Sequence, residues 1–315
     1  MKRLIILCLL ISFSFTAELS LMFWNVENLF DIEDNPIKRD NDFLPGGAKR
    51  YTYRSFCLKV QHLADVINHL DPDLLSMVEV ENEKALKSLC SELKHRNDWA
   101  IIIDEGPDIR GIDPALIYRK SIFEYCSHNY YPVFIQDRGY HSRPIMRVDL
   151  AVIGLRDTLS IFINHWPSRR GGKAHSDQFK HYAAECLLQA VNETIEEHEN
   201  YRLIITGDFN DDREDECIRH LEKAGLTYRV KNMPKHIHGT YYHDGEWIQF
   251  DHFLTYNVIN DLCSIRSCRI VAPHWIRENE TNGPLRYYKG LENLGGYSDH
   301  YPILLELSLK RKYVE

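Results

Sequence analysis

The sequence predicts a mixed α/β fold, because apolar runs of strand length recur along the whole chain and amphipathic stripes of helical spacing lie between some of them. Side chains three or four positions apart predict two helices with a buried face, one over 56–70 and one over 179–191. We see no repeat and no linker, so a single domain is expected. The expected strands are Leu19–Val26, Leu74–Val80, Trp99–Ile103, Ala115–Tyr118, Ile145–Leu155, Leu159–Asn164, Leu203–Thr206, Trp247–Thr255 and Pro302–Leu309.

Two polar, turn-rich insertions interrupt this pattern, Asn35–Arg54 and Arg277–Gly296. Loops of that length within a compact domain are typically functional or mobile. We therefore expect them to matter for the site or to move.

The composition is that of a soluble globular protein, with 44% hydrophobic and 27% charged residues. Beyond the N-terminus no apolar run approaches the roughly 18 residues of a spanning helix, so we expect no stable membrane insertion. The net charge of −8 argues against sequence-independent electrostatic binding of nucleic acid over a broad surface. Any polyanionic substrate must be bound by positive charge near the site. We expect a monomer.

The N-terminus has the pattern of a signal peptide: Lys2 and Arg3, the apolar stretch Leu4–Phe15, then Thr16 and Ala17. This predicts a leader over residues 1–17 and a single domain over 18–315. The protein is then exported, either periplasmic or secreted. Leu7 precedes Cys8, which is not the small-residue context of a lipid-anchored cysteine, so a free form is favoured.

Acidic, amide and histidine side chains gather where predicted strands end, which is where α/β proteins place their sites. With eight scattered cysteines and no Cys-x-x-Cys pair, a zinc site is not indicated. Oxygen-rich ligands suit Mg²⁺ or Mn²⁺, with Ca²⁺ as a further option. The segments are Trp24-Asn25-Val26-Glu27, Val78-Glu79-Val80-Glu81, Asn164-His165, Thr206-Gly207-Asp208-Phe209-Asn210, Phe250-Asp251-His252 and Ser298-Asp299-His300-Tyr301-Pro302.

In this order and spacing, the segments resemble the endonuclease/exonuclease/phosphatase superfamily, specifically its deoxyribonuclease-like, bacterial exported members. The resemblance extends from residue 24 to residue 302. It implies a four-layer α/β/β/α sandwich of two mixed β-sheets with outer helices. It also implies a hydrolase that cleaves a phosphodiester or phosphomonoester with the help of a divalent metal.

The resemblance assigns metal binding to Glu79, with Asn25 beside it. Acids that match Glu27 and Asp299 contribute directly or through water. A divalent ion beside the phosphate stabilises the charge that develops on its oxygens in the transition state. We expect the neighbouring acids Glu81 and Glu83 to be merely exposed.

The same resemblance makes Asn210 a donor to the phosphoryl oxygen, and Asp208 either orients the attacking water or binds the metal. His300 can accept a proton from water, and Asp251 is the candidate that orients it. His165 would hydrogen-bond the phosphate or protonate the leaving oxygen. His252, next to Asp251 on a strand, should point to the opposite face.

Positive charge near the site is expected from Arg143, Arg169 and Arg170, because arginine binds phosphate in a bidentate manner. These are the candidate substrate-binding residues, although a solvated basic loop is an equally good interpretation for Arg170. They make a nucleic acid substrate, DNA or RNA, the leading hypothesis.

Two alternatives stay open: a small-molecule or lipid phosphodiesterase or phosphatase on the same fold, and a binding scaffold without activity. The scaffold is disfavoured because none of the expected catalytic residues is missing. Inositol-phosphate chemistry is disfavoured because Asp211-Asp212 follows Asn210 in place of that branch's Tyr-Arg. The replacement of a tyrosine contact by His165 argues against specificity for abasic sites.

Overall fold

The computed structural model describes residues 16–135, 139–155, 158–169, 172–198, 201–258 and 263–310. Most of the predicted leader and the candidate Arg170 lie outside these ranges. Thr16 and Ala17, the last two residues of the predicted leader, begin the first strand and pair with Lys310 and Leu309. Cleavage of the leader stays a prediction.

Two six-stranded mixed sheets form the centre of the molecule. The first contains, in spatial order, β15 (Cys263–Ile270), β18 (Ile303–Lys310), β1 (Thr16–Leu29), β2 (Leu74–Val80), β4 (Asp113–Arg119) and β3 (Trp99–Ile102). The second contains β11 (Thr227–Tyr228), β14 (Asp251–Tyr256), β10 (Arg202–Asp208), β9 (Thr158–His165), β8 (Ile145–Val152) and β5 (Phe123–Tyr131). Each sheet has one parallel pair at its centre, β1 with β2 and β9 with β10.

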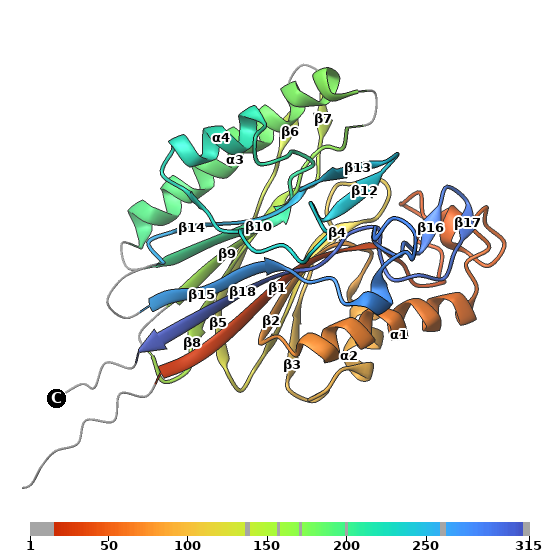
Figure 1. The fold of residues 1–315 in the computed structure, drawn as a ribbon, viewed down its shortest axis with the longest axis horizontal. Helices are drawn as coiled ribbons and strands as arrows, with labels where there is room; N and C mark the ends of the chain where they lie inside the picture. Colours follow the sequence, from red (N-terminus) through yellow and green to blue (C-terminus); the bar gives the residue numbers. More distant parts are fainter. Residues whose placement is uncertain are drawn as a thin grey trace, which may run out of the picture.

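Four helices cover the outer faces of the two sheets (Figure 1). Helices α1 (Tyr53–Leu70) and α2 (Glu83–Glu92) pack on the first sheet, and α3 (Lys173–Glu197) and α4 (Glu216–Lys223) lie over the second. Side-chain caps start α1 and α2: Thr52 accepts from the Ser55 amide, and Asn82 from the Ala85 amide. The predicted α/β/β/α sandwich is confirmed.

The two long insertions pack against each other at one end of the molecule. The first contains the 3₁₀ turn η1 (Asn41–Phe43), and the second the short hairpin of β16 (Tyr288–Lys289) and β17 (Glu292–Asn293). The ring of Phe43 lies 5.8 Å from that of Tyr288, and Lys49 Nζ donates to the Gly290 carbonyl at 2.8 Å. A second hairpin, β12 (Tyr241–His243) with β13 (Glu246–Ile248), lies at the same end (Figure 1).

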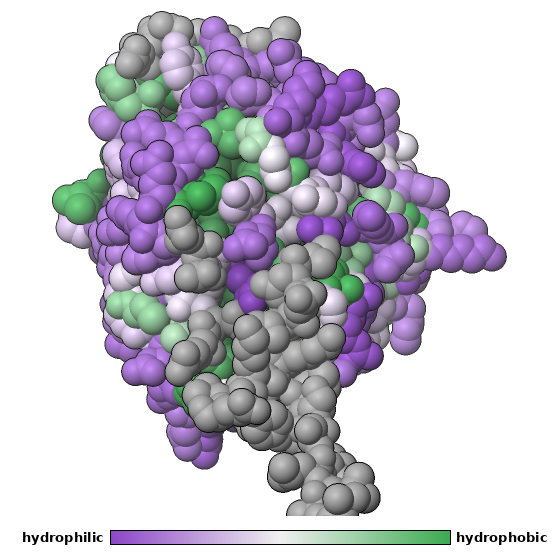
Figure 2. Space-filling model, turned by 90° about the vertical axis from the view of Figure 1, so that its left-hand side faces the viewer, coloured by the Kyte–Doolittle hydropathy of each residue, from purple (hydrophilic) through white to green (hydrophobic). Residues whose placement is uncertain are grey.

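The opposite end of the molecule faces the viewer in Figure 2. Figure 2 shows that hydrophilic side chains cover most of the area of this end that is not grey. Among the described residues, no helix is long and apolar enough to cross a membrane.

Several elements differ from the sequence-based expectation. The run Trp247–Thr255 is divided between β13 and β14, and strands β5 and β15 were not predicted. Both are outer strands in which buried positions alternate with exposed or half-buried ones or are few, so they lack a continuous apolar signal. The short helices α2 and α4 and the small hairpins, including β6 (Phe134–Ile135) with β7 (Tyr140–His141), were also missed.

Gly207 permits the close approach of β10 to β9 immediately before both strands end. It pairs with Asn164, and a Cβ at position 207 would lie 2.2 Å from the Asn164 carbonyl oxygen. That distance is far inside van der Waals contact, so a larger residue would force the two strands apart. The next register pair along is His165 with Asp208.

We predict that Gly207→Ala lowers the free energy of unfolding by about 1 to 3 kcal/mol, as for other overpacked sites. Denaturant unfolding of the two proteins measures the difference. Gly46→Ala is the matched control, because a Cβ there meets no atom within 4 Å. Equal stability of the Gly207 variant and the wild type would contradict this account of the strand contact.

Candidate active site

Strand register brings three predicted catalytic residues into one row. His165 ends β9, Asp208 ends β10 and Asp251 begins β14, and Asp208 is the direct partner of both of the others. All three side chains are buried. Because β14 runs antiparallel to β10, its first residue meets the last residue of its neighbour.

The first sheet contributes Asn25 and Glu79 from irregular ends of the parallel strands β1 and β2. The register of this pair shifts after Asn25, and Glu79 has a left-handed backbone with φ 65°. Asn25 Nδ2 donates to Asp208 Oδ2 at 3.0 Å and lies 3.4 Å from Glu79 Oε1. This amide therefore joins a carboxylate of each sheet.

His300 completes the group from the segment that precedes β18. Its Nδ1 is hydrogen-bonded to Asp251 Oδ2 at 2.7 Å, and its Nε2 lies 3.8 Å from Asp208 Oδ2. The backbone is fixed as well, since Trp24 Nε1 donates to the His300 carbonyl at 2.8 Å. The expected pairing of His300 with Asp251 is present.

The two histidines have opposite electrostatic environments. Burial, Arg143 and Arg110 lower the pKa of His165 well below its usual range, so it is neutral at pH 7. Burial alone would lower the pKa of His300, but Asp251 and Asp208 raise it well above that range. This environment favours the protonated form of His300 in the absence of a cation, and its expected role as proton acceptor stays a prediction. Burial raises the pKa of Asp208 to about 7.

The donor set fits a divalent cation. Burial and the charge of Asp299 raise the pKa of Glu79, and Glu79 and Asp208 share the Asn25 amide. Carboxylates packed in this way repel each other, and a cation would relieve that repulsion. Glu79 and Asp208 would hold it, and such an ion offsets negative charge on a bound phosphate. Asn25, predicted as a ligand, instead presents its Nδ2 to both carboxylates, and its Oδ1 accepts from the Glu27 amide. Ligand atoms of Asp208, Asp251 and His300 also lie within 4.8 Å of one another.

Glu27 differs from the expectation that it serves a metal. Its two carboxylate oxygens accept from the backbone amides of Tyr287 and Tyr288 at 2.6 and 2.7 Å. Burial and the charge of Asp299 raise its pKa to about 8. The left-handed backbone at Glu27, with φ 49°, turns its carboxylate to that loop. Asp299 is half-buried and lies close enough to both glutamates to repel them.

Asn210 follows Asp208 in a tight turn with φ 50°. Its amide nitrogen donates to Asp208 Oδ1 at 2.9 Å, and its Nδ2 donates to the Trp166 carbonyl at 3.1 Å. The side chain is thus anchored beside Asp208, with one N–H available for a further acceptor. His252 faces away as expected, toward the Asp211 carbonyl at 2.8 Å.

The predicted phosphate-binding arginines are held by the protein itself. Arg143 is buried and donates to the carbonyls of His165 and Trp166. Arg169 donates to the Asn210 carbonyl at 3.0 Å and to Asp215. Both guanidinium groups therefore fix the strand ends, and their assignment as substrate ligands stays a prediction. Arg170 lies outside the described residues.

Other cations lie at the rim, and the sequence analysis missed them because no motif marks them. Arg110, whose side chain is 43% exposed, acts electrostatically on both Glu79 and His165. Lys49 is close enough to Glu79 and Asp299 for their charges to raise its pKa, although burial lowers it overall. Arg286 lies 5.9 Å from the ring of Tyr241, which itself lies 5.0 Å from the His300 ring.

The prediction that Glu81 is exposed was wrong. Its side chain is buried and accepts a hydrogen bond from the Asp31 amide.

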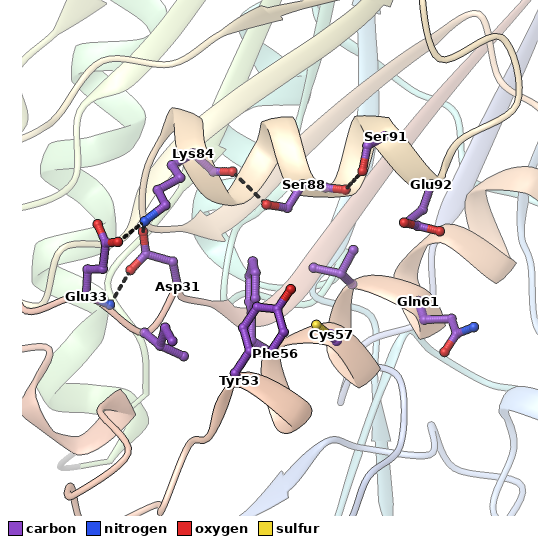
Figure 3. Close-up of a pocket in the computed structure, with 12 residues that line it drawn as sticks. Asp31, Glu33, Tyr53, Phe56, Cys57, Gln61, Lys84, Ser88, Ser91 and Glu92 are labelled. Carbon is purple, nitrogen blue, oxygen red and sulfur yellow. Dashed lines mark hydrogen bonds and ion pairs between the residues drawn. The ribbon is translucent and has the colours of Figure 1, made fainter.

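A separate cleft of about 470 Å³ lies between α1 and α2 (Figure 3). Asp31 and Glu33 at its left end in the figure pair with Lys84. Phe56 and Tyr53 line the side formed by α1, and Ser88 and Ser91 the side formed by α2. None of the described residues that line this cleft is a histidine, so they do not reproduce the acid and base pairing of the strand-end cluster.

Fold and site together define a metal-dependent hydrolase of phosphate esters. The model of the Endonuclease/Exonuclease/phosphatase family matches residues 20–309, and the chain belongs to this family. No curated protein matches the sequence.

Solved structures give the same fold at low identity. A D. rerio TDP2 complexed with a single-strand DNA product has a TM-score of 0.60 and 15% identity, over 92% of this chain and 99% of its own. The 2',3'-cyclic phosphatase ANGEL2 has a TM-score of 0.65 and 13% identity, over 94% and 98%. A Bacteroides thetaiotaomicron mannosyl-6-phosphatase has a TM-score of 0.59 and 16% identity, over 92% and 99%.

We predict that the affinity for Mn²⁺ rises with pH between 5 and 8. The pKa of Asp208 is about 7 and that of Glu79 is raised, so protons compete with the cation at the acidic end of this range. Isothermal titration calorimetry in buffers of different ionisation enthalpy measures both affinity and proton release. A flat affinity over this range, with no proton released, would contradict the assignment.

We also predict that Asp251 and His300 act as one unit. Each of Asp251→Asn and His300→Ala should lower kcat by about 10² to 10⁴, as for positioned acid–base groups. The double variant should be little worse than His300→Ala alone. His165→Ala combined with Asp251→Asn is the control, and its losses should multiply. Multiplicative losses for Asp251 and His300 would show that their hydrogen bond has no catalytic role.

Proposed function

We propose that this hydrolase is an exported nuclease that uses Mg²⁺ or Mn²⁺ to cleave phosphodiesters of DNA or RNA. The observation that carries the proposal is the convergence of Asn25, Glu79 and Asp208 on one side and the Asp251–His300 pair on the other. This arrangement places a cation site and a histidine–carboxylate pair around one position.

The residues suggest a division of labour during hydrolysis. Asp208, which would also hold the cation, orients the attacking water beside it. His300 Nε2 donates toward the phosphoryl group, and Asp251 stabilises the imidazolium. Neutral His165 donates a hydrogen bond to a phosphate or leaving oxygen, and Asn210 Nδ2 supplies another donor.

The rim supports a nucleic acid over a small phosphate ester. Lys49, Arg110 and Arg286 surround the acidic cluster, although the chain as a whole has a net charge of −8. Local cations of this kind can bind flanking phosphates. The half-buried ring of Tyr241 beside His300 offers a surface on which a base can stack.

A lipid phosphodiester is the second candidate, and one observation favours it. Leu291 and Leu294, at the β16–β17 hairpin, are 60% and 44% exposed. Exposed leucines beside a phosphoesterase site would contact acyl chains at a lipid surface.

A substrate panel with EDTA controls separates these functions: single-stranded DNA, plasmid DNA, RNA, sphingomyelin vesicles, a sugar phosphate and a chromogenic diester. We predict highest kcat/KM on a nucleic acid. Arg286→Ala should reduce kcat/KM on that polymer by about tenfold more than on the chromogenic diester, as expected for a flanking-phosphate contact. Preference for sphingomyelin or the sugar phosphate would reject the nuclease.

Export is also a proposal, and it rests on the leader pattern of residues 1–17. Expression of the full chain in a bacterial host, followed by N-terminal sequencing of the periplasmic fraction, tests it. A protein that keeps Met1 and stays in the cytoplasm would contradict export.

A further inference from the structure

A fully buried lysine lies beneath the turn that carries Asn210. Lys180 belongs to α3, and none of its side chain is exposed. Its Nζ pairs with Asp177 Oδ1 at 2.8 Å, donates to Asp211 Oδ1, and lies 3.4 Å from the Asn210 carbonyl oxygen. The contact with Asp177 is an ion pair, and both hydrogen bonds of the ammonium group go to the turn, one to the Asp211 carboxylate and one to the Asn210 carbonyl.

Burial of an ammonium group is unfavourable for folding, because the group loses its hydration. An apolar side chain of similar length would pack at this position at less cost. The two hydrogen bonds and the ion pair hold the ammonium group in place. They tie the turn 210–211 to α3, a helix that itself contributes no predicted site residue.

The turn needs such support because its backbone is strained. Asn210 has φ 50°, a conformation that is sparsely populated for residues with a side chain. Arg169 Nε donates to the same Asn210 carbonyl at 3.0 Å, and His252 Nε2 lies 2.8 Å from the Asp211 carbonyl. Side chains of α3, of β14 and of the loop after β9 thus hold the back of the turn, while Asp208 and Asn210 face the site.

We infer that Lys180 is a positioning residue for hydrolysis, which acts through the Asn210 turn and does not touch the substrate. Through its bonds to Asn210 and Asp211 it sets where Asn210 Nδ2 lies relative to Asp208. The inference rests on the proposed function, in which Asn210 donates to the phosphoryl group.

The test is a double-variant cycle between Lys180→Met and Asn210→Ala. Methionine keeps the length and apolar stem of the lysine but removes its donors. Lys180→Met should lower kcat about 10- to 100-fold with little change in KM, since misplacement of about 1 Å has that effect. The double variant should be close to Asn210→Ala alone, because both changes remove the same function.

Lys59→Met is the matched control. Among the described residues, Lys59 on α1 is the other fully buried lysine, and it donates to the Tyr297 carbonyl at 2.6 Å, away from the Asn210 turn. Its loss should multiply with that of Asn210→Ala. Lys180→Met/Asp211→Asn removes both charges of the pair, so it should regain stability relative to Lys180→Met while kcat stays low.

Hydrogen exchange of residues 209–212 gives a readout that does not depend on activity. We expect faster exchange in Lys180→Met and no change in Lys59→Met. Multiplicative losses for Lys180→Met and Asn210→Ala, or unchanged exchange over the turn, would overturn the inference. If the wild type hydrolyses no substrate, the proposed function fails, and the exchange experiment still decides whether Lys180 fixes the turn.

Discussion

The hydrogen bond from Asn25 Nδ2 to Asp208 Oδ2, at 3.0 Å, is the contact on which the rest of the site depends. Asn25 lies near the end of β1 in one sheet, and Asp208 ends β10 in the other. The distance between the two sheets therefore sets the distance between the carboxylates that would hold a cation. A small change in sheet packing would separate them, so the apolar interior of the sandwich also determines the site.

The contact between the two sheets at the site requires the burial of many charged groups, which is unfavourable for folding. Glu27, Lys59 and Lys180 are all buried, and each is hydrogen-bonded to a side chain or to the backbone. Removal of one partner from such a network leaves an unpaired buried charge, which destabilises more than the pair itself contributes. The acids are only partly compensated, as the raised pKa values of Glu27, Asp208 and Glu79 show. A bound cation would supply the missing positive charge.

The sequence predicted the centre of the fold better than its margins. Central strands such as Leu74–Val80 are continuous apolar runs because both faces are buried, and β2 has the predicted bounds. Most residues of strand β5 are exposed or half-buried, so its sequence lacks the apolar signal from which a strand is predicted. The site followed from strand-end motifs, but the role of Arg143 did not, because only the folded chain shows that its guanidinium reaches the His165 carbonyl. The left-handed backbone that turns Glu27 away is likewise invisible in the sequence.

Hydrolysis of a chromogenic phosphodiester by the wild type and Glu79→Gln, after EDTA treatment and stepwise return of Mg²⁺, tests the central claim most directly. Glu83→Gln is the control, since Glu83 is exposed and pairs with Lys87. The account predicts no activity in EDTA, recovery with Mg²⁺ in the wild type and the control, and little recovery in folded Glu79→Gln. Full activity in EDTA, or the same Mg²⁺ dependence in Glu79→Gln as in the wild type, would contradict it.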